Sequence, residues 1–152
     1  MVFPKDKMLR IRTAPAESDA GAVNSLYRIN CTQFEPTVNL PADATLLFND
    51  SALDEGTTSV AKTQELDALD LFQLAILTDF SGLTGEDIKL ARYSNTSFCK
   101  VTSVTKTSGA DATLEYSFED LPLQLLDTEE PCSDGVRRFD YNDVVVYVDI
   151  LD

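Results

Sequence analysis

The sequence predicts an all-β domain, and more specifically a β-sandwich of jelly-roll type with at most one short helix. Seven to nine short segments have the alternating or continuous apolar pattern of strands, and polar loops separate them. There is no internal repeat and no low-complexity tail. With 152 residues, of which 43% are hydrophobic, we expect one domain that buries a sizeable core.

The N-terminal half supplies four of these elements. Residues 8–12 alternate apolar and basic side chains, as a half-buried strand does, and residues 14–24 read as a polar loop. Short strands are predicted at 26–30 and 45–48, followed by a long surface connection at 52–63. Residues 65–80 are ambiguous, because a partial helical stripe overlaps an alternation of Phe72, Leu74 and Ile76. We expect a short helical turn that leads into a buried strand at about 71–78.

The C-terminal half continues the strand pattern. Residues 87–91 predict a strand or turn, and residues 97–105 alternate with one irregularity that we interpret as a bulge. Residues 106–110 predict a hairpin tip, after which 113–118 place Leu114, Tyr116 and Phe118 on one face. The last strand, 143–151, places four aliphatic residues on one face and the remaining side chains on the other: Val144, Val146, Val148 and Ile150 against Val145, Tyr147 and Asp149.

Charge and residue usage exclude several classes of function. The net charge of −14 argues against nucleic acid and anionic membranes as partners, and favours divalent cations or a basic partner unless the acidity serves only solubility. No segment is long enough to insert in a membrane. The absence of histidine removes His-based triads and the commonest zinc sites. The three cysteines permit one disulfide, for example Cys99 with Cys132, or none.

Two acidic motifs in the last third carry the candidate site. FEDLP spans residues 118–122 and DYNDVVVYVDI spans 140–150, and each places oxygen ligands at the end of an apolar run. If the two strands are neighbours, their acidic ends meet at one edge of the sandwich, where calcium takes six to eight oxygens. The candidate ligands are Glu119, Asp120, Asp140, Asn142 and Asp143. Magnesium is the second choice, because it requires a tighter octahedral geometry.

The same acidic residues also fit simpler roles. Asx side chains before a strand are ordinary turn chemistry, and Glu119 could pair with Arg137 or Arg138. The acidic loop 123–139 could complete a second cation site or simply be solvated. Tyr141 and Tyr147 could stack on a ligand, although packing is the commoner role. Paired carboxylates could serve as the catalytic pair of a glycosidase. Nothing in the sequence indicates a carboxyl with a raised pKa or an aromatic surface for a sugar ring, so we expect no enzymatic activity.

The order F-E-D-L-P, loop, D-Y-N-D-V-V-V resembles the C-terminal signature of domain-of-unknown-function family 4114, and LruC-like domains share the second motif. The resemblance implies an extracellular or cell-surface bacterial β module that binds calcium and belongs to a larger exported protein. The family commonly has G-D-x-D before the second motif, whereas Arg138 stands at an acidic position here. Either Asp134 supplies the missing ligand from further up the loop, or the site is weaker or lost.

These observations lead to three expectations about function. The first is a non-catalytic, calcium-stabilised binding, spacer or adhesion module, with Met1 as the start of a domain excised from a longer chain. The second is a purely structural or assembly module, such as a coat, appendage or matrix component without a metal. The third is calcium-dependent recognition of a glycan or peptide, and a neighbouring protein domain is a further conceivable partner.

Overall fold

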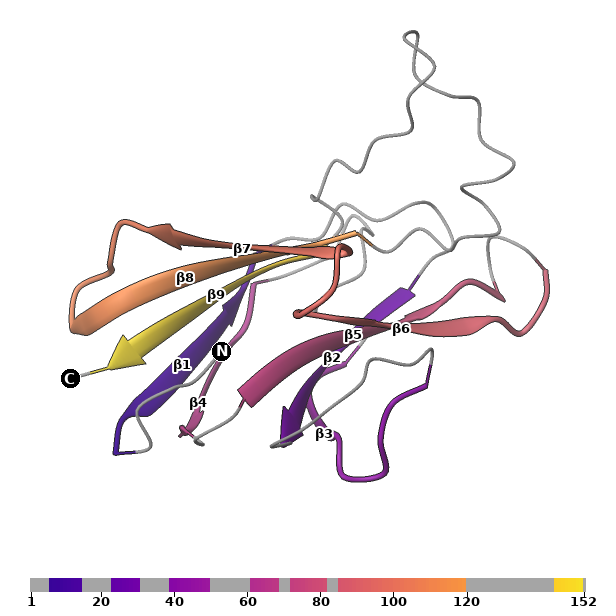
Figure 1. Ribbon diagram of the computed structural model, residues 1–152, viewed down its shortest axis with the longest axis horizontal. Helices are drawn as coiled ribbons and strands as arrows, with labels where there is room; N and C mark the ends of the chain where they lie inside the picture. The colour runs from indigo at the N-terminus through magenta and orange to yellow at the C-terminus, as the bar shows by residue number, and fades with distance from the viewer. Residues whose placement is uncertain are drawn as a thin grey trace, which may run out of the picture.

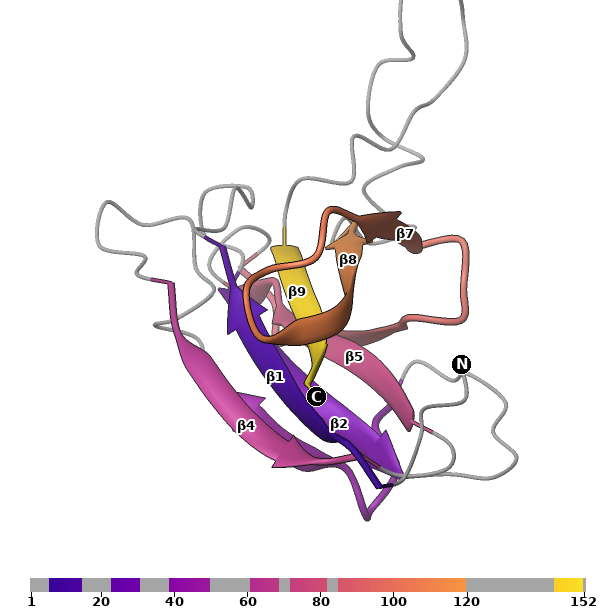
Figure 2. The same ribbon diagram turned by 90° about the vertical axis from the view of Figure 1, so that its left-hand side faces the viewer.

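The computed structural model describes residues 6–14, 23–30, 39–49, 61–68, 72–81, 85–119 and 144–151, and the elements formed by these residues are all β-strands (Figure 1). The strands form two antiparallel sheets, which confirms the expected all-β, sandwich-like class. In Figure 2 the five-stranded sheet faces the viewer, and β2 and β5 of the other sheet lie behind it.

The larger sheet has the strand order β4-β1-β9-β8-β7, and the smaller has the order β3-β2-β5-β6. The strands of the larger sheet are β4 (Thr63–Asp67), β1 (Met8–Thr13), β9 (Val144–Leu151), β8 (Ala110–Phe118) and β7 (Cys99–Val104). Those of the smaller sheet are β3 (Thr45–Phe48), β2 (Val23–Asn30), β5 (Phe72–Asp79) and β6 (Lys89–Tyr93). The first and last strands of the chain are therefore neighbours, since β1 pairs with β9.

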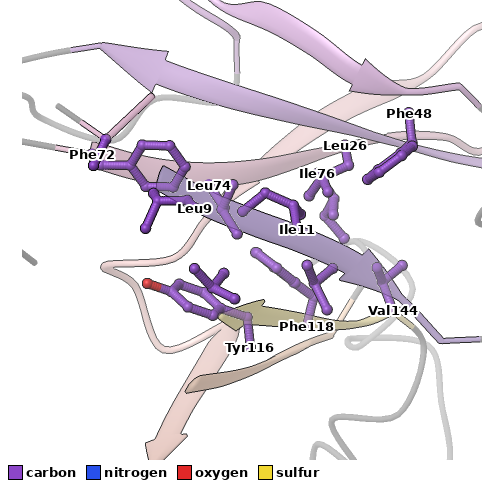
Figure 3. Packing of buried hydrophobic residues seen from close by; sticks show 13 residues of the cluster. Leu9, Ile11, Leu26, Phe48, Phe72, Leu74, Ile76, Tyr116, Phe118 and Val144 are labelled. Atoms are coloured by element: carbon purple, nitrogen blue, oxygen red, sulfur yellow. The ribbon is translucent and has the colours of Figure 1, made fainter. Parts of the chain in front are cut away.

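The main core lies between the sheets and follows directly from the period-two patterns of the strands. Alternate residues of β1, β8 and β9 face inward, as do those of β2 and β5 on the opposite sheet, because successive side chains of a strand point to opposite faces. Figure 3 shows this cluster, with Tyr116 and Phe118 packed against Leu9, Ile11 and residues of the other sheet. Its fully buried aliphatic members are Leu9, Ile11, Leu26, Leu74, Ile76, Val144, Val146 and Val148.

Most of the predicted strands are confirmed, and the differences have physical causes. The helical turn predicted from residue 65 is wrong, because Thr63–Asp67 forms β4. This strand pairs with β1 and packs Leu66 against the core. An apolar residue at this position fits a strand with one buried face as well as it fits a helical stripe. The bulge predicted within 97–105 is also wrong: β7 pairs with β8 without interruption, and the register shift lies between β8 and β9 at Ala110 and Ala112.

Candidate functional site

Of the predicted calcium ligands, the structure describes Glu119. This residue follows β8 directly and is only 5% exposed, and its backbone N–H donates to the Phe98 carbonyl at 2.8 Å. The other five candidates, Asp120, Asp134, Asp140, Asn142 and Asp143, lie outside the described residues, as do Tyr141 and the loop 123–139. Within the described ranges, no group of three or more acidic or cysteine side chains is placed to hold a metal ion.

The strands that carry the two motifs are direct neighbours. β8 and β9 pair antiparallel along their length, and Phe118 is the register partner of Val144. Phe118 is the first residue of the FEDLP motif, and Val144 follows the DYND tetrapeptide immediately in the sequence. The condition on which the predicted site depended, that the two strands be adjacent, is therefore met, with Phe118 opposite Val144.

A second acidic feature, which the sequence reasoning did not single out, lies on the outer face of the five-stranded sheet. Asp149 of β9 is fully buried, although it points away from the main core. Its Oδ2 accepts from Arg10 Nε at 2.8 Å and from Arg12 Nε at 2.7 Å. Its Oδ1 accepts from Arg12 Nη2 at 3.1 Å, Thr107 Oγ1 at 3.0 Å and Thr113 Oγ1 at 2.7 Å.

We refer to Asp149, Arg10, Arg12, Thr107 and Thr113 as the Asp149 network. It joins β1, β9, β8 and the β7–β8 hairpin, and Arg10 Nη2 closes it by donating to Thr107 Oγ1 at 3.0 Å. Burial by itself raises the pKa of Asp149, but the hydrogen bonds from Arg12, Thr113, Arg10 and Thr107 outweigh it and hold the pKa well below its ordinary value. Both carboxylate oxygens are occupied by protein donors, so this acid is suited to fixing strands rather than to binding a cation.

The sequence did contain a signal for this network. Arg10 and Arg12 alternate with the buried Leu9 and Ile11, which puts both guanidinium groups on the solvent side of β1. Asp149 likewise occupies the outer face of the last strand. What the sequence could not supply was the register in which Arg10 lies opposite Asp149, because that requires pairing the first strand with the last.

Tyr147 belongs to the same outer face. The guanidinium of Arg12 lies 5.0 Å from the centre of its ring, within the range of a cation–π contact. Burial and the neighbouring Glu115 carboxylate raise the pKa of the Tyr147 hydroxyl. The contact with Arg12 fits the packing role expected for this tyrosine.

Cys99 begins β7 and is a free thiol, so it forms no disulfide with Cys132. Burial raises its pKa to about 12, although a hydrogen bond with the Ser117 backbone acts in the opposite direction. A thiol with so high a pKa is protonated at neutral pH, and since the thiolate is the nucleophile, Cys99 is poorly suited to nucleophilic catalysis.

No family model, no curated protein and no solved structure matches this chain. The resemblance to family 4114 therefore rests on the two quoted motifs alone. In the part of the chain that the structure describes, no helix is long and apolar enough to cross a membrane.

Proposed function

We propose that this chain is a non-catalytic, calcium-binding β-sandwich module of an exported or cell-surface protein, with a binding, spacer or adhesion role. The pairing of Phe118 with Val144 carries the proposal, because it brings the end of β8, next to FEDLP, and the start of β9, next to DYND, together at one end of the sheet. The ligand set of Glu119, Asp120, Asp140, Asn142 and Asp143, with Asp134 in place of the position taken by Arg138, consists of the carboxylate and amide oxygens that calcium prefers.

The jelly-roll type is part of the same proposal. The chain passes from one sheet to the other between β1 and β2, β3 and β4, β4 and β5, and β6 and β7. Repeated crossings of this kind are typical of the Greek-key connections from which jelly rolls are built. They support the assignment, which a solved structure with a clear topological match would test.

Thermal melts test the calcium site. A ligand present at about 100 times its Kd stabilises the fold by about 2.7 kcal/mol. For a domain of this size that corresponds to a rise of roughly 5–10 °C in Tm. We expect this rise in millimolar calcium after chelator treatment, a smaller one in magnesium, and none in Asp143→Asn or Glu119→Gln.

Asp111→Asn is the matched control, since Asp111 is an exposed acid of β8 paired with Lys7 rather than a proposed ligand. It should keep the full calcium response. Calorimetric titration of calcium into each folded variant separates lost binding from lost stability. A completely stripped wild-type protein with neither a Tm shift nor a binding heat would overturn the proposal.

The Asp149 network favours a second candidate, the purely structural or assembly module. It fixes the C-terminal strand through protein groups alone, with five hydrogen bonds to one carboxylate and no need for a metal. This candidate predicts that chelators leave stability and protease resistance unchanged. The same melts therefore decide between the two.

A further inference from the structure

The outer face of the four-stranded sheet holds a half-open pocket of about 200 Å³ that the calcium site does not involve. Its floor comes from alternate residues of three neighbouring strands, which the register places side by side: Val23 opposite Asp79, Ser25 opposite Leu77, and Asp79 opposite Lys89. Tyr27 forms the end of the β2 row. β2, β5 and β6 belong to the sheet that lacks β8 and β9, so the pocket and the strands that carry Phe118 and Val144 lie on different sheets.

Among the described residues, those that cover this face lie at the end next to the pocket. Ile29, Ala75, Ala91 and Tyr93 form a second small apolar cluster on the outer side of the sheet. Leu40 and Ala44, from the turn before β3, pack on that cluster, and the Tyr93 hydroxyl donates to the Asn39 carbonyl. Tyr27 and Leu77 pack on this cluster and also line the pocket, so that apolar side chains continue from the cluster into the pocket.

The lining combines an apolar surface with groups that bind hydroxyls. Val23, Leu77 and the ring of Tyr27 supply the apolar part, while the Asp79 carboxylate accepts hydrogen bonds and Lys89 donates them. Asp79 is fixed in place, because its Oδ1 accepts from the Ser81 N–H at 2.9 Å. Lys89 is adaptable, since its side chain is 54% exposed and its Nζ lies 4.0 Å from Asp87, at the limit of an ion pair.

Size and charge restrict the ligand. The volume lies below the roughly 300–1,000 Å³ of pockets that enclose drug-sized molecules, so a single ring fits better than a long chain. The one carboxylate and one ammonium of the lining cancel, and the net charge of −14 repels anions at a distance. A neutral ring with polar edges and one apolar face fits the small volume, the cancelling charges of the lining and the negative net charge of the chain.

We propose that this pocket binds one neutral monosaccharide unit, with the Tyr27 ring against the apolar sugar face and with Asp79 and Lys89 on its hydroxyls. Tyrosine suits this role because it presents a rigid apolar ring and a polar tip. So small and open a site gives a Kd in the millimolar range for a free sugar. The site does not depend on calcium, and its success or failure is independent of the function proposed above.

Two-dimensional ¹H–¹⁵N NMR of the uniformly labelled chain tests the proposal. Glucose, galactose, mannose and N-acetylglucosamine are titrated separately to about 100 mM, which covers a millimolar Kd. At least one sugar should shift the amides of Val23, Ser25, Tyr27, Leu77, Asp79 and Lys89 saturably, and leave Glu119 and Val144 unmoved. The dispersion of each spectrum shows at the same time that the variant is folded.

Matched variants identify the contacts. Tyr27→Ala and Asp79→Asn should weaken binding at least about tenfold, whereas Tyr27→Phe and the neighbouring Asp87→Asn should stay within about threefold of the wild type. If no sugar shifts the lining amides saturably, or if Asp79→Asn binds as the wild type does, the proposal is overturned. Binding of the zwitterion L-alanine in preference to every sugar would also overturn it, because Asp79 and Lys89 would then serve an ammonium and a carboxylate.

Discussion

Replacing Asp149 by asparagine tests whether the Asp149 network stabilises the sandwich. The substitution keeps the shape of the side chain but removes its charge, and it places an NH₂ group where Oδ1 or Oδ2 accepts hydrogen bonds. Arg10 and Arg12 then lose their common counter-ion. The NH₂ group also replaces one acceptor, either Oδ1, to which Thr107 and Thr113 donate, or Oδ2, to which the two arginine Nε atoms donate. The substitution therefore affects contacts among β1, β8, β9 and the β7–β8 hairpin.

The size of the effect follows from burial. Removing one partner of a buried ion pair costs about 3–5 kcal/mol when the remaining charge stays buried. Here the carboxylate is fully buried, but the Arg10 and Arg12 side chains are 24% and 29% exposed, so water can partly solvate them afterwards. We therefore expect a loss of about 2–3 kcal/mol in the free energy of unfolding, below the full cost of a buried pair. At about 2–4 °C per kcal/mol, Tm should fall by roughly 4–12 °C.

The pH dependence adds a second readout with a defined sign. The pKa of Asp149 is lower in the folded state than its ordinary value of 3.8, so the unfolded state binds the proton more tightly. The stabilisation is complete above pH 3.8 and is lost as the pH falls from there toward the folded pKa. The difference in stability between wild type and Asp149→Asn should hence be constant near neutral pH and shrink in acid.

Urea unfolding followed by circular dichroism, repeated from neutral pH down to about pH 3, measures both quantities. Asp111→Asn is the control, because Asp111 pairs with Lys7 at 3.1 Å on an exposed surface, where ion pairs contribute about 0–1 kcal/mol. If Asp149→Asn loses no more stability than Asp111→Asn, or if its deficit stays constant into acid, the network does not stabilise the fold as its geometry indicates.

Two further predictions concern single residues. Cys99 should react very slowly with iodoacetamide at pH 8 in the native protein and rapidly in denaturant, because burial raises its pKa to about 12. Mass spectrometry measures the rate of alkylation, and equal rates in the two states would contradict the burial of Cys99. Gly109 has a φ of +84° in the β7–β8 hairpin, and a Cβ added there meets nothing within 4 Å. Gly109→Ala should therefore lower the free energy of unfolding by about 1 kcal/mol through backbone strain alone. An unchanged urea midpoint would contradict the assigned turn.

The fold was largely predictable because its strands alternate cleanly. Val144, Val146 and Val148 are all fully buried, and the opposite face carries Tyr147 and Asp149, as the period of two requires. The segment around residue 65 was misjudged because Leu66 and Leu69 are three residues apart, a spacing that also fits one face of a helix. Only the pairing of β4 with β1 distinguishes the two, and that contact is remote in sequence.

The candidate sites were less predictable, for a related reason. The proposed calcium site required the two strands that carry the motifs to be neighbours, and the β8–β9 pairing fulfils that condition. The Asp149 network and the pocket at Tyr27 depend on pairings between strands far apart in the chain, namely β1 with β9 and β2 with β5. Period-two patterns show which face a residue occupies, but not which residue of another strand lies beside it.

The two acidic features lie toward opposite ends of β9, and this separates their effects. Val144 and Asp149 are five residues apart, which is about 17 Å along a strand, and perturbations at such a distance are usually additive. Acid would weaken both, because protonation would remove ligands of the proposed calcium site as well as the charge of Asp149. Acid sensitivity alone therefore cannot identify a calcium site in this chain. Chelation at neutral pH can, because there the Asp149 network is fully ionised and contributes equally with and without the metal.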